Sequence, residues 1–194
     1  MHIVLASASP RRKEIFSMFG LSPEICVSSV DESYDAGLSP EEVVKTLSYK
    51  KGEAVAGKFP DAMVVSADTV VAFGGEILGK PCDESDAVKM LKSLSGTTHE
   101  VWTGYTVFLG GKSVTCAVLT KVRFKSLSHD EILSYVKTGE ALDKAGSYGA
   151  QGKASVFVEG IEGDFFNVVG FPLSHFYDTV KREFHIDLWK VEKI

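Results

Sequence analysis

Long apolar runs, paired histidines and an excess of positive charge are all missing from this 194-residue chain. Its apolar stretches are too short to cross a bilayer, and Met1-His2-Ile3 leads into a strand pattern rather than a charged leader, so we expect a cytoplasmic protein. The formal charge of -5 argues against a nucleic-acid polymer or an anionic membrane as partner, because both need a dense positive field. An anionic ligand must therefore meet a local basic cluster.

Cysteine is also scarce. Cys26, Cys82 and Cys116 are odd in number and widely spaced, which is typical of reduced core cysteines rather than of a disulfide framework. The five histidines lack the spacing that builds a zinc site from one helix or hairpin, so we expect no zinc. A hydrophobic content of 44% is enough for a substantial core, as one domain or as two lobes around a cleft.

Hydrophobic periodicity predicts strands mixed with helices along the whole chain. The predicted strands are 3–6, 25–30, 63–73, 76–78, 101–109, 114–124, 155–158 and 165–169, with glycine-pair hairpins at 74–75 and 110–111. Helices are expected to open at Ser9-Pro10, Ser39-Pro40, Glu84, Ser128 and Pro172. Residues 140–153 have no regular period, and a long loop of that kind between ordered elements is interpreted as functional. No repeat or linker marks a covalent domain boundary.

A first candidate site lies between the first strand and the first helix, in Ser7-Ala8-Ser9-Pro10-Arg11-Arg12. Backbone N–H groups at a helix N-terminus attract phosphate, and two hydroxyls with two guanidinium groups would complete an anion cradle. The alternative is that Ser9 only caps the helix while Arg11 and Arg12 are solvated. Charge favours phosphate binding, since cations at a helix N-terminus are electrostatically misplaced unless an anion is also present.

A second candidate is Asp68, inside the apolar run around Ser66-Ala67-Asp68-Thr69. A carboxylate is costly to bury, so Asp68 should lie at a strand end, in a cleft or at a metal, although it could simply hydrogen-bond a loop. Glu32 adds a second carboxylate, and two such ligands plus substrate phosphates suit Mg²⁺ or Mn²⁺. For Glu32 alone, a solvated loop position is the simpler interpretation.

Two lysines complete the set of candidates. Lys80 ends a stretch that imitates a phosphate-binding P-loop, but Pro81 lacks the hydroxyl that such a loop needs. Lys80 could still reach a phosphate as a single charge from a strand end. Lys51 lies on the apolar edge of its predicted helix, where it either reaches a phosphate or snorkels to solvent.

Taken as a whole, the chain resembles the Maf family of nucleotide pyrophosphatases. The resemblance is carried by blocks that span nearly the whole chain, namely 5–12, 66–71, 79–81, 139–152 and 163–173. It implies a mixed α/β fold, a twisted sheet with flanking helices in two lobes around a deep cleft, related to the inosine triphosphate pyrophosphatases. It also implies a divalent cation, Mg²⁺ or Mn²⁺, a nucleoside triphosphate substrate and, by resemblance alone, a homodimer.

The resemblance also suggests residue roles. Asp68 is similar to the family's general base, and Glu32 to an acidic position near the metal. The substrate-selecting positions are matched by Arg11, Thr69 and Gln151, and the phosphate-contacting positions by Ser7, Arg12, Lys51 and Lys80. The context Lys50-Lys51-Gly52 is unusual for the family, which leaves open the choice between the two lysines.

The segment Tyr148-Gly149-Ala150-Gln151-Gly152 resembles the branch that acts on dTTP and UTP, with CTP or modified pyrimidine nucleotides as further substrates. A glutamine amide offers a donor and an acceptor, which complement the O4 and N3–H edge of uracil and thymine. Two alternatives stay open at this point. One is a pyrophosphatase for modified purine nucleotides such as 7-methyl-GTP, and the other is a nucleotide-sensing regulator of cell division without turnover.

Overall fold

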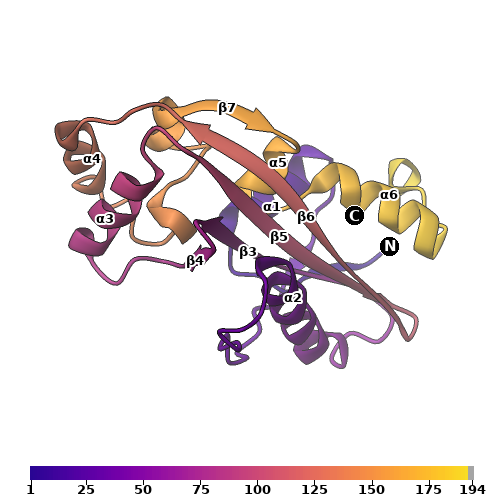
Figure 1. The fold of residues 1–194 in the computed structure, drawn as a ribbon. Helices are drawn as coiled ribbons and strands as arrows, with labels where there is room; N and C mark the ends of the chain where they lie inside the picture. The colour runs from indigo at the N-terminus through magenta and orange to yellow at the C-terminus, as the bar shows by residue number, and fades with distance from the viewer. Residues whose placement is uncertain (192–194) are drawn as a thin grey trace. The chain divides into compact units, whose positions relative to one another are not determined.

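The computed structural model describes residues 1–191, and Figure 1 shows their mixture of strands and helices. The strands are β1 (Ile3–Leu5), β2 (Glu24–Ile25), β3 (Met63–Phe73), β4 (Glu76–Leu78), β5 (Thr98–Leu109), β6 (Lys112–Phe124) and β7 (Val158–Glu162). The α-helices are α1 (Pro10–Met18), α2 (Pro40–Ala56), α3 (Glu84–Leu94), α4 (His129–Val136), α5 (Phe165–Val169) and α6 (Leu173–Phe184). Short 3₁₀ helices are η1 (Ala145–Ser147), η2 (Lys153–Phe157) and η3 (Leu188–Lys190).

The strands pair in the order β2-β1-β3-β5-β6-β7, with β4 added to β3. Strand β1 runs parallel to both neighbours, so that Val4 pairs with Val64 of β3. Strand β4 runs antiparallel to β3, and β7 runs antiparallel to β6. Mixed pairing with helices in the connections confirms the predicted mixed α/β class.

The chain divides into two compact units. Unit 1 comprises residues 1–68, 103–118 and the chain from Gly170 onward, and unit 2 comprises 69–102 and 119–169. In unit 1, α2 packs through Val55 on the strand residues Val4 and Val64, with Phe108 at the edge of this core. In unit 2, the core joins Leu91 of α3, Ile132 of α4 and Phe124 of β6, and α3 lies beside α4 (Figure 1).

Local chemistry explains where the helices begin. Both Ser39 and Ser128 form capping boxes. In each, the serine hydroxyl accepts the backbone N–H of a glutamate three residues later, and the carboxylate of that glutamate accepts the backbone N–H of the serine. Ser9 occupies the N-cap position of α1 as predicted, but its side chain makes no capping hydrogen bond. The predicted bounds of β3 and β4 and the predicted start of α3 at Glu84 are confirmed.

Three predicted strands were wrong. Of the strand expected over 25–30, only Ile25 is in a strand, as the second residue of β2, because β1 ends at Leu5 and offers no further parallel partner. Residues 165–169 form helix α5 instead of a strand, since the Asp164 carboxylate accepts the N–H groups of Phe166 at 2.7 Å and Asn167 at 3.3 Å. Residues 155–158 lie mostly in η2, where the N–H of Ser155 donates to Gly152 O at 3.0 Å.

The three cysteines are free, in agreement with the absence of a disulfide framework in the sequence. Their predicted place in the core was wrong, because Cys82 is exposed and Cys26 and Cys116 are only partly buried. Within residues 1–191, no helix combines the length and the apolar character needed to cross a membrane.

Candidate active site

Arg12 of unit 1 is held by hydrogen bonds to a side chain and to the backbone. Its Nη1 donates to Ser7 Oγ at 3.0 Å, and its Nε donates to the backbone carbonyl of Gly170 at 2.9 Å. Ser7 is buried where β1 passes into α1, and Ser7 Oγ also accepts the N–H of Ser9 at 3.3 Å. The predicted pair of Ser7 and Arg12 is therefore brought together by the structure. The Gly170 carbonyl was missed, because a backbone oxygen has no residue-type signal in a sequence.

The charges around Arg12 have both signs. Loss of hydration on burial lowers the pKa of Arg12, an effect that the negative charges of Asp68 and Glu32 oppose and the positive charge of Arg11 reinforces. A guanidinium nevertheless stays protonated in proteins. Two arginines and two carboxylates of unit 1 are thus close enough to influence one another electrostatically.

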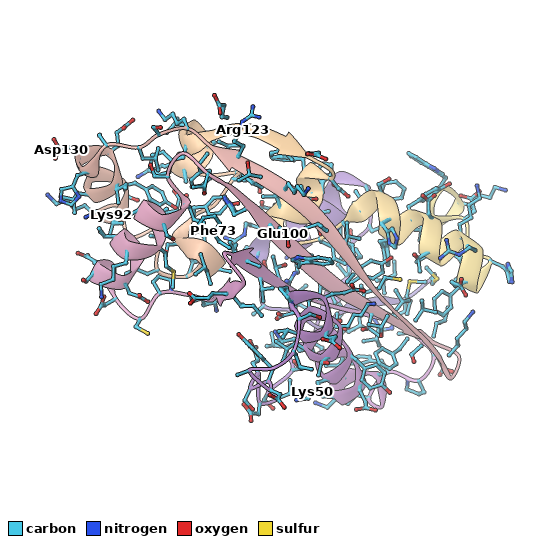
Figure 2. All side chains as sticks on the ribbon, viewed as in Figure 1. Lys50, Phe73, Lys92, Glu100, Arg123 and Asp130 are labelled. Atoms are coloured by element: carbon cyan, nitrogen blue, oxygen red, sulfur yellow. The ribbon has the colours of Figure 1, made fainter. Side chains whose placement is uncertain are left out.

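Lys51 lies at the centre of the carboxylates. Its Nζ donates to Asp68 Oδ1 at 2.5 Å and is 3.1 Å from Glu32 Oε1. The side chains of Lys51 and Asp68 are only 11% and 12% exposed, whereas that of Glu32 is 64% exposed. The snorkelling alternative for Lys51 was therefore wrong. Lys50, labelled on α2 in Figure 2, is exposed and donates to Ser33 O at 3.4 Å, so Lys51 is the lysine that faces the carboxylates.

A glycine explains how α2 brings Lys51 so near to β3. A Cβ added at Gly52 would lie 2.5 Å from Ser66 Oγ and 2.5 Å from the Phe108 ring, closer than real Cβ atoms come. Ser66 Oγ in turn donates to Ser48 O of α2 at 2.6 Å. The unusual Lys51-Gly52 context is thus a packing requirement, because only glycine permits this approach.

The carboxylate pair fits a hard divalent cation. Asp68 and Glu32 present oxygens to the same ammonium group, and carboxylate oxygens are the ligands that Mg²⁺ and Mn²⁺ prefer. Within residues 1–191, no group of three or more His, Cys, Asp or Glu residues could hold a metal ion. Two protein ligands are what a cation shared with substrate phosphates needs.

The other three predicted site residues belong to unit 2. Thr69 is partly buried on β3, and Lys80 and Gln151 are exposed in loops. The two loops are tied together, since the N–H of Gly146 donates to Gly79 O at 3.1 Å. The segment 140–153 is held at its ends as well, because the Glu140 carboxylate accepts the N–H of Lys153 at 3.1 Å.

His99 is a buried titratable group of unit 2 that the sequence did not single out. It is 1% exposed, and its Nε2 lies 2.8 Å from the Tyr148 hydroxyl. Burial lowers the pKa of His99 from 6.5 to about 4 and raises the pKa of Tyr148 above its ordinary value. Both side chains are therefore neutral near pH 7.

The buried His99 predicts an acid-sensitive stability. The unfolded chain takes a proton below its ordinary pKa of 6.5, whereas the folded ring stays neutral down to about pH 4. Stability is complete above pH 6.5 and is lost as the pH falls toward 4, by about 2 kcal/mol between pH 7 and pH 5. Urea unfolding of the wild type and of His99→Gln at both pH values measures this difference. Equal pH dependence in the two proteins would show that the ring is not held neutral.

The fold and this cluster define a mixed α/β protein in which the cationic side chains of Arg12 and Lys51 lie near two carboxylates, those of Asp68 and Glu32. A sequence model described as Maf-like protein matches residues 2–183. Relatives from Bacillus cereus (strain AH820), Bacillus thuringiensis subsp. konkukian (strain 97-27) and Bacillus anthracis are each 47% identical over 186 residues, which cover 96% of this chain and 97% of each relative. All three relatives are named dTTP/UTP pyrophosphatase. The chain belongs to the Maf family.

A solved structure, the Ham1 protein of Staphylococcus aureus, is similar at a TM-score of 0.40 and 14% sequence identity. The similarity covers 64% of this chain and 72% of that one.

Proposed function

We propose that the protein is a nucleoside triphosphate pyrophosphatase that hydrolyses dTTP and UTP to the monophosphate and pyrophosphate. The observation that carries the proposal is the convergence of Arg12, Lys51, Asp68 and Glu32 in unit 1. The relatives named dTTP/UTP pyrophosphatase, which match nearly the full chain, support the same activity. CTP and modified pyrimidine nucleotides are further candidate substrates.

Each residue of the cluster has a proposed role. Asp68 orients the attacking water and accepts its proton, because it is a carboxylate held in place by Lys51 at 2.5 Å. Arg12 and Lys51 stabilise the negative charge that develops on the departing pyrophosphate, a contribution that is large in phosphoryl transfer. The resemblance adds Ser7, Arg11 and Lys80 to the groups that contact the substrate.

Asp68 and Glu32 are proposed to hold a divalent cation, Mg²⁺ or Mn²⁺, together with phosphate oxygens of the substrate. When bound, the cation would neutralise charge on the triphosphate and polarise the reacting phosphorus. Lys51, which bridges the two carboxylates, would keep both side chains oriented toward that position. The homodimer implied by the resemblance stays a prediction.

Selection of the base is assigned to Thr69 and Gln151 of unit 2 and to Arg11. Gln151 is exposed, and its amide can donate to O4 and accept from N3–H of uracil or thymine. We expect Gln151→Ala to lower kcat/KM for UTP and dTTP about tenfold relative to CTP and GTP, the loss that about 1.4 kcal/mol of hydrogen bonding produces. Steady-state kinetics on the four nucleotides, with inhibition by pyrophosphate as the control for phosphate binding, test this. Equal losses on all four would remove the role.

A nucleotide panel tests the function itself. The purified protein is incubated with UTP, dTTP, CTP, GTP and 7-methyl-GTP in Mg²⁺ or Mn²⁺, and the products are separated by chromatography. Monophosphate and pyrophosphate from UTP and dTTP support the proposal. Preferential cleavage of 7-methyl-GTP would favour the purine alternative, and tight binding without any product would favour a nucleotide-sensing regulator.

A further inference from the structure

Gln151 lies in a short turn that is attached directly to a buried tyrosine. The N–H of Gly152 donates to Gly149 O at 3.0 Å, which closes a four-residue turn with Gln151 at its third position. Tyr148 immediately precedes this turn and is buried, whereas Gln151 is exposed. The placement of Tyr148 therefore sets where the turn begins and in which direction it leaves the core of unit 2.

The backbone before Tyr148 is strained. Gly146 and Ser147 have φ values of 64° and 62°, and a non-glycine residue in this left-handed region costs about 1–3 kcal/mol. Glycine is required at 146 for a second reason, because an added Cβ would lie 2.9 Å from a methyl group of Val71. Such a kink persists only where the surrounding contacts determine it. Ser147 is fully buried and donates from Oγ to the sulfur of Met90 at 3.1 Å.

His99 supplies the polar contact that holds the tyrosine after this kink. The His99–Tyr148 hydrogen bond is 2.8 Å long, and the two rings meet edge to face at 5.3 Å. Phe124 packs edge to face against both, at 4.9 Å from His99 and 4.7 Å from Tyr148. Within residues 1–191, His99 Nδ1 has no hydrogen-bond partner, so the contact with Tyr148 is the polar bond of this buried imidazole. Breaking it would leave two buried polar groups unsatisfied.

The turn after Tyr148 has little freedom of its own. An added Cβ at Gly149 would meet the Lys144 side chain at 2.8 Å, and one at Gly152 would meet Glu140 Oε1 at 2.1 Å. Lys144 Nζ donates to the backbone carbonyl of Glu140 at 2.6 Å, and the Glu140 carboxylate accepts the N–H of Lys153 at 3.1 Å, so both side chains that border the turn are held by hydrogen bonds. A displacement of Tyr148 is therefore transmitted to Gln151 rather than absorbed by the glycines.

Fixing the turn has a consequence for recognition. An amide carries both a donor and an acceptor, so an unrestrained glutamine can rotate to match uracil or cytosine. Selection of the uracil edge needs a backbone that holds the amide in one place, because discrimination depends on leaving the wrong base with unpaired groups.

We propose that His99 and Tyr148 act through their hydrogen bond as positioning residues that aim Gln151 at the pyrimidine base and thereby set uracil-over-cytosine selectivity. The inference rests on the proposed function for its substrate. It assigns no contact with the nucleotide to either His99 or Tyr148, and both act only through the turn at 149–152.

Tyr148→Phe is the primary test, because it removes the hydroxyl and keeps the ring. We expect the UTP:CTP ratio of kcat/KM to fall about tenfold, which corresponds to a loss of about 1.4 kcal/mol in discrimination between the two nucleotides. The kcat for CTP should change by less than about twofold. Amide hydrogen exchange of residues 149–152 in the free protein should become faster. Tyr105→Phe is the matched control. Tyr105 is a buried tyrosine of unit 1, and its hydroxyl forms a hydrogen bond of 2.7 Å with the imidazole Nδ1 of His175. This control should leave the ratio and the exchange of the turn unchanged.

A double variant separates positioning from packing. His99→Phe with Tyr148→Phe replaces both polar partners by rings of similar shape, so stability should recover. The selectivity ratio should stay low if the hydrogen bond aims the turn. Recovery of the ratio together with stability, or a Tyr148→Phe ratio within twofold of the wild type, would overturn the proposal. If the wild type cleaves no nucleotide, the proposed function fails, and exchange at 149–152 alone decides whether the pair positions the turn.

Discussion

Asp68→Asn should lower the turnover of UTP by about 10²-fold or more, the usual contribution of a general base. The amide has the shape of the carboxylate and can still accept the hydrogen bond that Lys51 Nζ donates at 2.5 Å. It cannot take a proton from water at neutral pH, so the chemical step should be affected more than substrate binding. The measurement is kcat for pyrophosphate release, followed with a coupled inorganic pyrophosphatase.

A surface carboxylate of the same unit provides the control for Asp68. Asp61 is exposed in the turn before β3, and Asp61→Asn should keep normal turnover. If Asp68→Asn also retained near-normal turnover while remaining folded, the proposed base would be wrong. Tight UTP binding with no turnover in the wild type would instead support the nucleotide-sensing regulator.

Lys51→Met should reduce both stability and activity. The substitution removes the cation between Asp68 and Glu32 and leaves a carboxylate that is only 12% exposed without its partner. Breaking a fully buried ion pair costs about 3–5 kcal/mol, and residual solvent access at this pair lowers our expected loss to about 2–3 kcal/mol. Urea unfolding with linear extrapolation measures this loss, and turnover of UTP measures the accompanying loss of charge stabilisation.

The adjacent lysine is a matched control for this variant. Lys50 is exposed on the same helix, so Lys50→Met should change the free energy of unfolding by less than about 0.5 kcal/mol and should leave turnover normal. Equal stability of Lys51→Met and Lys50→Met would contradict the role of Lys51 as the cation that holds the two carboxylates. A larger loss in Lys50→Met would reverse the assignment of the two lysines.

The fold was most predictable where local signals agreed with tertiary packing. The strand 63–73 and the hairpin through Gly74-Gly75 have both an apolar pattern and a turn that requires positive φ, and the structure reproduces their bounds. The helices after Ser39 and Ser128 were predictable because each capping box is formed by a serine and a glutamate only three residues apart in sequence. The segment 165–169 was not, because its apolar pattern suits a strand while the Asp164 carboxylate organises a helical turn.

The site shows the same division between local and distant causes. Lys51 could be singled out because a lysine on an apolar helix edge needs a partner, but its partner Asp68 is 17 residues away and had to be seen in the structure. The carbonyl of Gly170 that holds Arg12 lies 158 residues away in sequence and has no side chain. His99 escaped notice because it lies just before the predicted strand 101–109, and a lone histidine there has no signal until its partner Tyr148 is known.

The central claim is that water attacks the α-phosphorus of a pyrimidine triphosphate. Hydrolysis of UTP in H₂¹⁸O, with mass spectrometry of both products, tests it most directly. Attack at the α-phosphorus places one ¹⁸O in UMP and none in pyrophosphate. Label in pyrophosphate, or UDP with labelled phosphate, would contradict the account.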